Sequence, residues 1–97
     1  MKTLQEIKEI LARHKREIKE KYMVKEIGVF GSYLRGEHNK KSDIDILVEF
    51  YEVPGLLKFI ELEEYLEELL GVKVDLVRKG AIREELKRKI LDEVVLV

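Results

Sequence analysis

The sequence predicts one domain of the α+β or α/β class, with a small mixed sheet of three to four strands and helices packed on one face. Length is the first reason, because 97 residues fit a single compact domain, so we expect residues 1–97 to form one unit. The second reason is that short β-favouring runs alternate with longer segments of helical period. Apolar residues make up 45% of the chain, which is enough for one core.

The first half begins with a helix predicted over residues 3–22. Thr3 and Glu6 have the spacing of a capping box, and apolar residues follow them at every third or fourth position. A β-favouring run at 26–30 comes next and ends at Gly31-Ser32. We therefore expect a strand that leads directly into a glycine turn.

The second half repeats the alternation of strand and helix. Residues 43–51 are rich in β-branched and aromatic side chains and predict a strand. A helix is predicted over 56–70, with Gly71 in the position of a C-cap. We expect another strand at 72–77 and a charged amphipathic helix at 81–92.

Two apolar segments leave a question of burial open. Residues 94–97, Val-Val-Leu-Val, are a candidate fourth strand. The helix at 56–70 has a wide apolar stripe, most of which we expect in the core. Surplus apolar side chains in either segment are a candidate docking patch, an interpretation that uniform burial would contradict.

Composition limits the classes of partner and chemistry. The net charge is only −1, which argues against general binding to nucleic acid or to an acidic membrane. Charged residues interrupt the apolar positions near the start, and no apolar run approaches twenty residues, so we expect a cytoplasmic protein. The absence of cysteine excludes disulfides, thiolate metal sites and cysteine nucleophiles.

Three aspartates are the candidate catalytic and metal-binding residues. Residues two apart on a strand share a face, so Asp43 and Asp45 present paired carboxylates while Ile44 faces the core. Asp75 joins them if its strand is a neighbour, although a solvated strand end would also explain it. Such a cluster repels itself unless a cation offsets the charge, and Mg²⁺ prefers hard oxygen ligands. We expect Asp43, Asp45 and Asp75 to hold two Mg²⁺ ions for in-line phosphoryl displacement, with Asp75 also activating the acceptor hydroxyl.

The candidate nucleotide-binding residues precede the first two aspartates. Gly31 lets backbone amides approach phosphate oxygens closely, and the Ser32 hydroxyl adds a hydrogen bond. Arg35 and Lys41 lie between this turn and the carboxylates, where they can neutralise the phosphates of a leaving pyrophosphate. A structural salt bridge explains Arg35 equally well.

The stretch GSYLRGEHNKKSDIDILV resembles the signature of the nucleotidyltransferase superfamily related to DNA polymerase β, which is Gly-Ser, a ten-residue gap and Asp-x-Asp. It is most similar to the minimal nucleotidyltransferases (MNT), antitoxins found beside helical HEPN toxins, which share the small size and the Gly-Ser-x-x-Arg-Gly opening. Asp75 stands in the place of the family's third carboxylate. The resemblance implies the polymerase β-like fold, Mg²⁺, ATP as substrate, and AMP transfer onto a tyrosine of a cognate HEPN toxin.

Three functions remain in competition. The first is an enzyme that adenylylates a partner protein and so acts as the antitoxin of a toxin–antitoxin pair. The second is a non-catalytic antitoxin that neutralises its partner by occlusion. The third is a nucleotidyltransferase for a small molecule or an RNA end, which the near-neutral charge disfavours.

Overall fold

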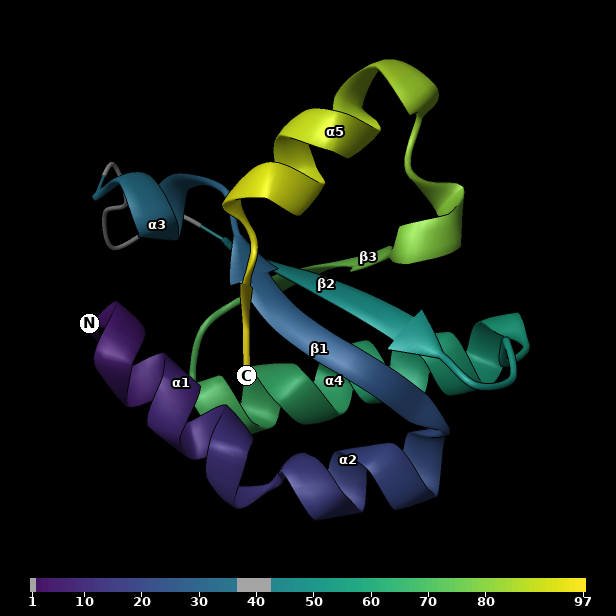
Figure 1. The fold of residues 1–97 in the computed structure, drawn as a ribbon. Coiled ribbons are helices and arrows are strands. Elements are labelled where there is room, and N and C mark those ends of the chain that lie inside the picture. Colours follow the sequence, from purple (N-terminus) through teal and green to yellow (C-terminus); the bar gives the residue numbers. More distant parts are fainter. Residues whose placement is uncertain (1, 37–42) are drawn as a thin grey trace.

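The computed structural model describes residues 2–36 and 43–97, which form a four-stranded mixed sheet with strand order β3-β2-β1-β4 (Figure 1). The predicted α+β class with a small mixed sheet is confirmed. In chain order the elements are α1 (Leu4–Arg13), α2 (Lys15–Tyr22), β1 (Val24–Phe30), α3 (Ser32–Arg35), β2 (Ile44–Phe50), α4 (Leu56–Leu70), β3 (Val74–Arg78), the 3₁₀ turn η1 (Lys79–Ala81), α5 (Glu84–Glu93) and β4 (Val95–Leu96).

The N-terminal helix is divided in two at His14. The predicted capping box is present, since the Thr3 hydroxyl accepts from the Glu6 amide at 3.1 Å and the Glu6 carboxylate accepts from the Thr3 amide at 3.0 Å. At the other end of α1, the His14 amide is shared between the carbonyls of Ile10 and Leu11, which tightens the last turn. His14 leaves helical geometry with φ −105° and ψ 7°. The prediction of one continuous helix over 3–22 was wrong at this residue.

The sheet combines both kinds of strand pairing. β1 pairs antiparallel with β2 and with β4, while β2 and β3 are parallel and are joined through α4. Parallel neighbours need such a crossover, whereas antiparallel neighbours do not. The final apolar stretch forms β4, as predicted, and the helix at 56–70 has the predicted bounds.

The other predicted bounds were displaced by one to three residues. β1 begins at Val24 because this residue pairs with Phe50 of β2. β2 spans Ile44–Phe50 rather than 43–51, and β3 spans Val74–Arg78 rather than 72–77. α5 begins at Glu84 and not at 81, because η1 and two extended residues come first.

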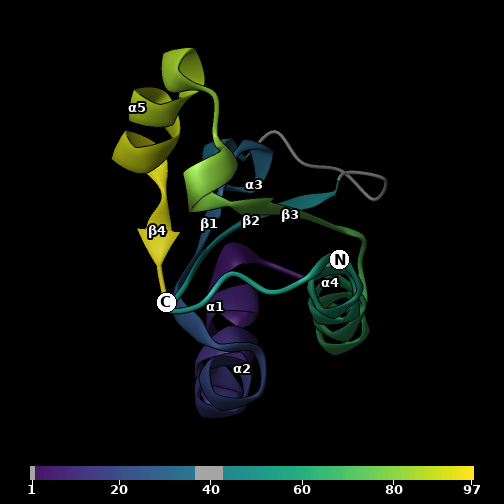
Figure 2. The same cartoon turned by 90° about the vertical axis from the view of Figure 1, so that its right-hand side faces the viewer.

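The core lies on one face of the sheet. In Figure 2, α1, α2 and α4 lie together on this side. Ile44, Ile46 and Val48 of β2 point toward them and are fully buried, as the alternation predicts. Burying an aliphatic side chain of this size contributes about 1.5–3 kcal/mol, so this face carries most of the hydrophobic stabilisation.

Among the described residues, η1 and α5 cover the second face of the sheet, on the side away from α1, α2 and α4 (Figures 1 and 2). No residue of α5 is buried. β4 attaches the end of α5 to β1 through a close approach at Gly28, where an added Cβ would lie 2.8 Å from Val94 Cγ2 and from the Val95 carbonyl oxygen. Of the helices within residues 2–36 and 43–97, none is long and apolar enough to span a bilayer.

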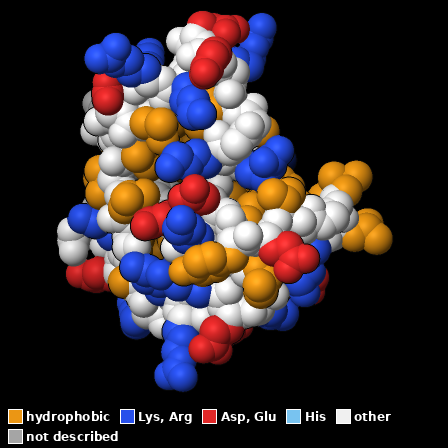
Figure 3. Space-filling model, turned by 45° about the vertical axis from the view of Figure 1, so that its right-hand side comes forward, with side chains coloured by type: hydrophobic (Ala, Val, Ile, Leu, Met, Phe, Trp, Pro, Cys, Tyr) orange, Lys and Arg blue, Asp and Glu red, His pale blue; other side chains and the backbone are white. Residues whose placement is uncertain are grey.

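Several large apolar side chains around the turn between β2 and α4 are exposed. Leu56 is 73% exposed and Leu57 83%, so the wide apolar stripe of α4 is not uniformly buried. Figure 3 shows hydrophobic side chains that project at the right-hand edge of the molecule. We use the name apolar corner for the exposed side chains of Met23, Tyr51, Val53, Leu56, Leu57 and Ile60.

Candidate active site

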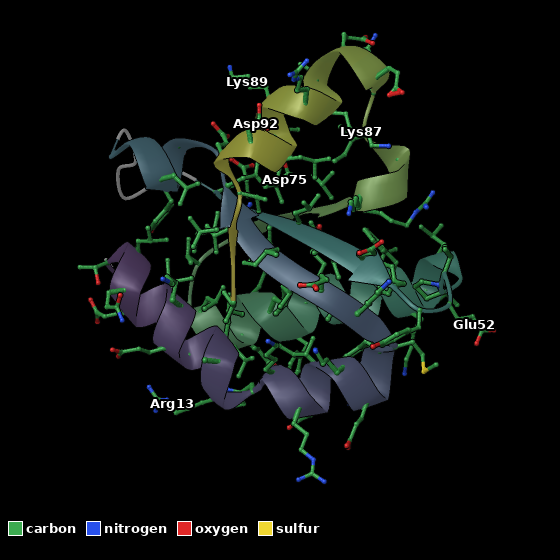
Figure 4. All side chains as sticks on the ribbon, in the orientation of Figure 1. Arg13, Glu52, Asp75, Lys87, Lys89 and Asp92 are labelled. Carbon is green, nitrogen blue, oxygen red and sulfur yellow. The ribbon has the colours of Figure 1, made fainter. Side chains whose placement is uncertain are left out.

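Asp45 and Asp75 are register partners on the parallel strands β2 and β3. Adjacent strands lie about 4.8 Å apart, and paired residues point to the same face of a sheet. Both carboxylates therefore stand on the second face, opposite to the buried isoleucines of β2. Asp45 is half-buried and Asp75 is exposed. Figure 4 shows Asp75 in the region between the sheet and α5.

Gly31 places the end of β1 against the Asp45 side chain. Its φ of 82° and ψ of −150° belong to a region that is nearly restricted to glycine. Phe30 is the register partner of Asp45, and a Cβ added to the next residue, Gly31, would overlap Asp45 Oδ2 and lie 2.9 Å from its Cγ. Only glycine allows this approach, which brings a backbone amide beside the carboxylates.

Ser32 is the first residue of the short helix α3 and is partly exposed. The following residue, Tyr33, anchors this helix in the core, and burial raises the pKa of its phenol. The Leu34 amide donates to the Gly31 carbonyl at 3.1 Å, which closes the turn. Ser32 is thus held at the end of β1, next to the amide of Gly31.

Three other predicted site residues are not seen in the cleft: Asp43 lies outside its lining, and the Arg35 side chain and Lys41 are not described by the structure. Asp43 is exposed and precedes β2 by one residue, because the ladder begins where the Ile44 amide donates to the Lys73 carbonyl at 2.9 Å. It does not line the cleft that contains Asp45 and Asp75. The side chain of Arg35 and the whole of Lys41 lie outside the residues that the structure describes.

A cleft of about 410 Å³ opens between the second face of the sheet and the segment formed by η1 and α5. Gly31, Asp45 and Asp75 lie in its polar part. Its basic residues, Arg83 and Lys89, come from the α5 side. The remaining wall is mainly apolar and is formed by Phe30, Val77, Ala81, Ile82, Leu86 and Ile90.

Glu93 is a residue of this cleft that sequence reasoning missed. It is the last residue of α5, and its Oε1 accepts a hydrogen bond from the Gly31 amide at 3.0 Å across 62 positions of sequence. Within a charged amphipathic helix, one more glutamate carries no local signal. Its place directly before the final strand is the one clue, because pairing of that strand with β1 brings Glu93 beside Gly31.

The donor atoms of the site fit Mg²⁺ when a nucleotide completes the coordination. Among residues 2–36 and 43–97, no three Asp, Glu or His side chains are grouped closely enough to hold a metal ion by themselves. Mg²⁺ is usually bound by one or two carboxylates, with water and substrate phosphates supplying the rest. The register pair Asp45 and Asp75 meets this requirement with oxygen ligands on one face.

Comparison with known proteins identifies the family. Residues 11–97 match the family model of the nucleotidyltransferase domain. The protein adenylyltransferase MntA of Thermococcus cleftensis is 59% identical over 97 residues, which cover all of this chain and 98% of that protein. A provisionally named protein adenylyltransferase of Methanocaldococcus jannaschii is 62% identical over 93 residues, which cover 96% of this chain and 95% of that protein.

Solved structures agree with this assignment. A structure provisionally described as a minimal nucleotidyltransferase is 34% identical with a TM-score of 0.75, covering 92% of this chain and 93% of that one. A toxin–antitoxin complex of MntA contains a chain that is 25% identical with a TM-score of 0.66, covering 96% and 68%. An MNT antitoxin complex with a tri-AMPylated HEPN toxin of Shewanella oneidensis shares the fold, with 23% identity, a TM-score of 0.69 and coverage of 95% and 69%. The chain therefore belongs to the nucleotidyltransferase domain family, as a minimal nucleotidyltransferase of the protein adenylyltransferase group.

Proposed function

We propose that this chain transfers AMP from ATP to a tyrosine hydroxyl of a cognate HEPN toxin and thereby acts as an antitoxin. The observation that carries the proposal is the register pair Asp45 and Asp75 beside the amide of Gly31, in one cleft. Paired carboxylates next to a backbone amide suit a metal-bound triphosphate. Relatives of about 60% identity named protein adenylyltransferases support AMP as the transferred group and a protein as the acceptor.

The proposed reaction is an in-line displacement at the α-phosphorus of ATP. The acceptor oxygen attacks, a new P–O bond forms, and the bond from the α-phosphorus to the oxygen bridging it to the β-phosphorus breaks. Pyrophosphate leaves with the electron pair of that bond. The hydroxyl proton passes to a carboxylate, and Asp75 is the candidate because its exposed side chain can meet an acceptor that enters the cleft.

The remaining roles follow from position. The Gly31 amide and the Ser32 hydroxyl bind phosphate oxygens, and Arg35 and Lys41 neutralise the leaving pyrophosphate. Asp43, Asp45 and Asp75 hold Mg²⁺, which when bound offsets the charge of the phosphates. Asp43 is exposed one residue before β2 and lies outside the cleft lining, so its part in holding Mg²⁺ stays a prediction from the sequence.

Two features support a protein acceptor with an aromatic side chain. The apolar wall of the cleft lies beside Asp75, and a tyrosine can place its ring on such a wall while its hydroxyl reaches the carboxylate. The apolar corner leaves several large apolar side chains in water, such as Leu57, and their exposure is unfavourable in a monomer. This exposure supports a surface that a partner protein covers.

The test is the intact mass of a cognate HEPN protein after co-expression with the wild-type chain or with Asp45→Asn. AMP additions that appear only with the wild type are the expected result, together with loss of toxicity. Asp92→Asn is the matched control, because it removes one exposed carboxylate outside the cleft lining and leaves transfer intact. Peptide mapping of the adduct then tests tyrosine as the acceptor.

Two other outcomes would replace the proposal. An unmodified HEPN protein that is still neutralised by Asp45→Asn would make the chain an antitoxin that acts by occlusion. Labelled AMP that appears on RNA or on a small molecule, with none on protein, would assign a different acceptor class. Replacing ATP with the other three nucleoside triphosphates in the same assay tests the preference for adenine.

A further inference from the structure

We infer that Glu93 occupies the place of a nucleotide phosphate oxygen at the Gly31 amide, so that nucleotide binding displaces this carboxylate and loosens the end of α5. The inference rests on the proposed function, since it requires the cleft beside Asp45 to be the nucleotide site. It goes beyond that function because it assigns α5 a role in the order of substrate binding.

The contact itself is the first reason. Glu93 Oε1 accepts from the Gly31 amide at 3.0 Å, which is the geometry expected of an anion at this donor. A carboxylate oxygen and a phosphate oxygen are equivalent acceptors for one N–H. The direction of this amide is fixed, because Gly31 has a φ of 82° and lies against the Asp45 carboxylate. Two anions therefore cannot both use it.

Charge is the second reason. Glu93 lines the same cleft as Asp45 and Asp75, and it adds a negative charge where the triphosphate, itself strongly negative, has to bind. The carboxylates of β2 and β3 have an evident purpose as ligands of a cation. Glu93 instead contacts the backbone donor that a phosphate oxygen would use, so it competes with the nucleotide for this amide.

The weak attachment of α5 makes displacement feasible. No residue of α5 is buried, whereas α1 and α4 each place fully buried side chains in the core. Segments with few buried apolar contacts open at the lowest free energy. β4, which follows α5, holds it to β1 through two register pairs, Val29 with Val95 and Gly28 with Leu96, and the next residue adds a hydrogen bond from its amide to the Ile27 carbonyl at 2.9 Å.

The consequence reaches the acceptor side of the cleft. Leu86 and Ile90 belong to its apolar wall and lie on the same helix as Glu93. When the end of α5 is released, this wall shifts with it. Nucleotide binding therefore prepares the acceptor side, and we expect the nucleotide to bind before the acceptor protein.

The competing interpretation is that Glu93 only supports the Gly31 turn and remains bonded to it in the complex. The two interpretations predict opposite signs. If Glu93 competes with phosphate, Glu93→Gln strengthens nucleotide binding, because a neutral amide gives way more easily than a carboxylate. If Glu93 supports the turn, the same change leaves binding unaltered or weakens it.

Calorimetric titration with a non-hydrolysable ATP analogue, with and without Mg²⁺, distinguishes them. We expect the Kd of Glu93→Gln to be about fivefold lower than that of the wild type, the size of effect that one charge has at about 4 Å in a water-like medium. Asp92→Asn is the matched control, since it removes the same charge from the adjacent exposed position outside the cleft lining, and its Kd should stay within about twofold. An unchanged or higher Kd for Glu93→Gln overturns the inference.

Hydrogen exchange of the wild-type chain gives a second measurement that needs no variant. Saturating nucleotide should speed exchange of the amides of residues 84–93, while those of α4 stay unchanged. Slower or unaltered exchange in α5 overturns the inference. If neither the wild type nor Glu93→Gln binds the analogue, the proposed function fails as well, whereas tight wild-type binding without the Glu93 effect contradicts this inference alone.

Discussion

Replacing Gly31 with alanine should abolish AMP transfer and destabilise the fold while leaving the chain folded. A non-glycine residue at φ 82° and ψ −150° costs about 1–3 kcal/mol in backbone strain. The added Cβ also overlaps Asp45 Oδ2, and forced overpacking costs about 1–3 kcal/mol more. The two terms together give an expected loss of roughly 2–6 kcal/mol, against a typical stability of about 5–15 kcal/mol. Since Asp45 is paired on both sides, its carboxylate has to rotate out of the site.

Urea unfolding and the rate of AMP transfer to the partner protein measure the two effects separately. Gly71→Ala is the matched control, because Gly71 has a φ of 68° at the end of α4 and, among the described residues, an added Cβ meets the end of the Lys2 side chain at 3.3 Å and nothing closer. It should lose about 1 kcal/mol of stability and keep the transfer rate. The reasoning is refuted if Gly31→Ala transfers AMP at the wild-type rate, or if it is no less stable than Gly71→Ala.

Three further changes test the site, the core and the pH response. Asp75→Asn should lower the single-turnover transfer rate by about 10²–10⁴-fold, as expected for loss of a general base, and unchanged transfer would remove Asp75 from catalysis. Leu62→Ala, at a fully buried position of α4, should cost about 2–5 kcal/mol in urea unfolding, and a smaller loss would mean that the core closes over the gap. Burial, with the nearby charge of Glu17, raises the pKa of Tyr65 from 10.0 to about 12. The folded state therefore holds this proton longer than the unfolded chain, so stability should fall as the pH rises from about 10 to 12. In Tyr65→Phe that part of the fall should be absent, and an identical alkaline profile would contradict the assignment.

Residues that begin or end a helix explain which parts of the fold were predictable. The helix α4 has its predicted bounds because glycines stand at both of its ends, and Gly71 adopts the left-handed conformation of a C-cap. The break at His14 was not predictable, since the apolar period continues on both sides of it and the last turn of α1 tightens only through the shared amide bond. The late start of α5 was not predictable either, because the 3₁₀ turn η1 follows β3 directly and no residue before Glu84 marks the delay.

The candidate site divides in the same way. The alternation of apolar and polar residues along β2 correctly predicted its buried face. The opposite face is then the one that carries Asp45. Asp75 lies next to Asp45 because β2 and β3 are neighbours in the sheet. No local sequence pattern gives this long-range pairing, so the sequence analysis could only assume it. Glu93 and the wall from α5 depend on the pairing of β4 with β1, so no local pattern pointed to them.

The register pairing of Asp45 with Asp75 makes the site sensitive to a one-residue shift of either strand, but not to the length of the segment that connects the two strands. Opposite faces of a strand alternate with every residue, so a shift of β3 by a single residue would present Val74 or Leu76 to solvent and turn Asp75 into the core. Residues added to the segments around α4 leave this arrangement intact if the strands keep their pairing. Single deletions within 51–55 and 71–72, which flank α4, should therefore be tolerated. A single-residue slip within β3 should not be, because it turns the face that carries Asp75 toward the core.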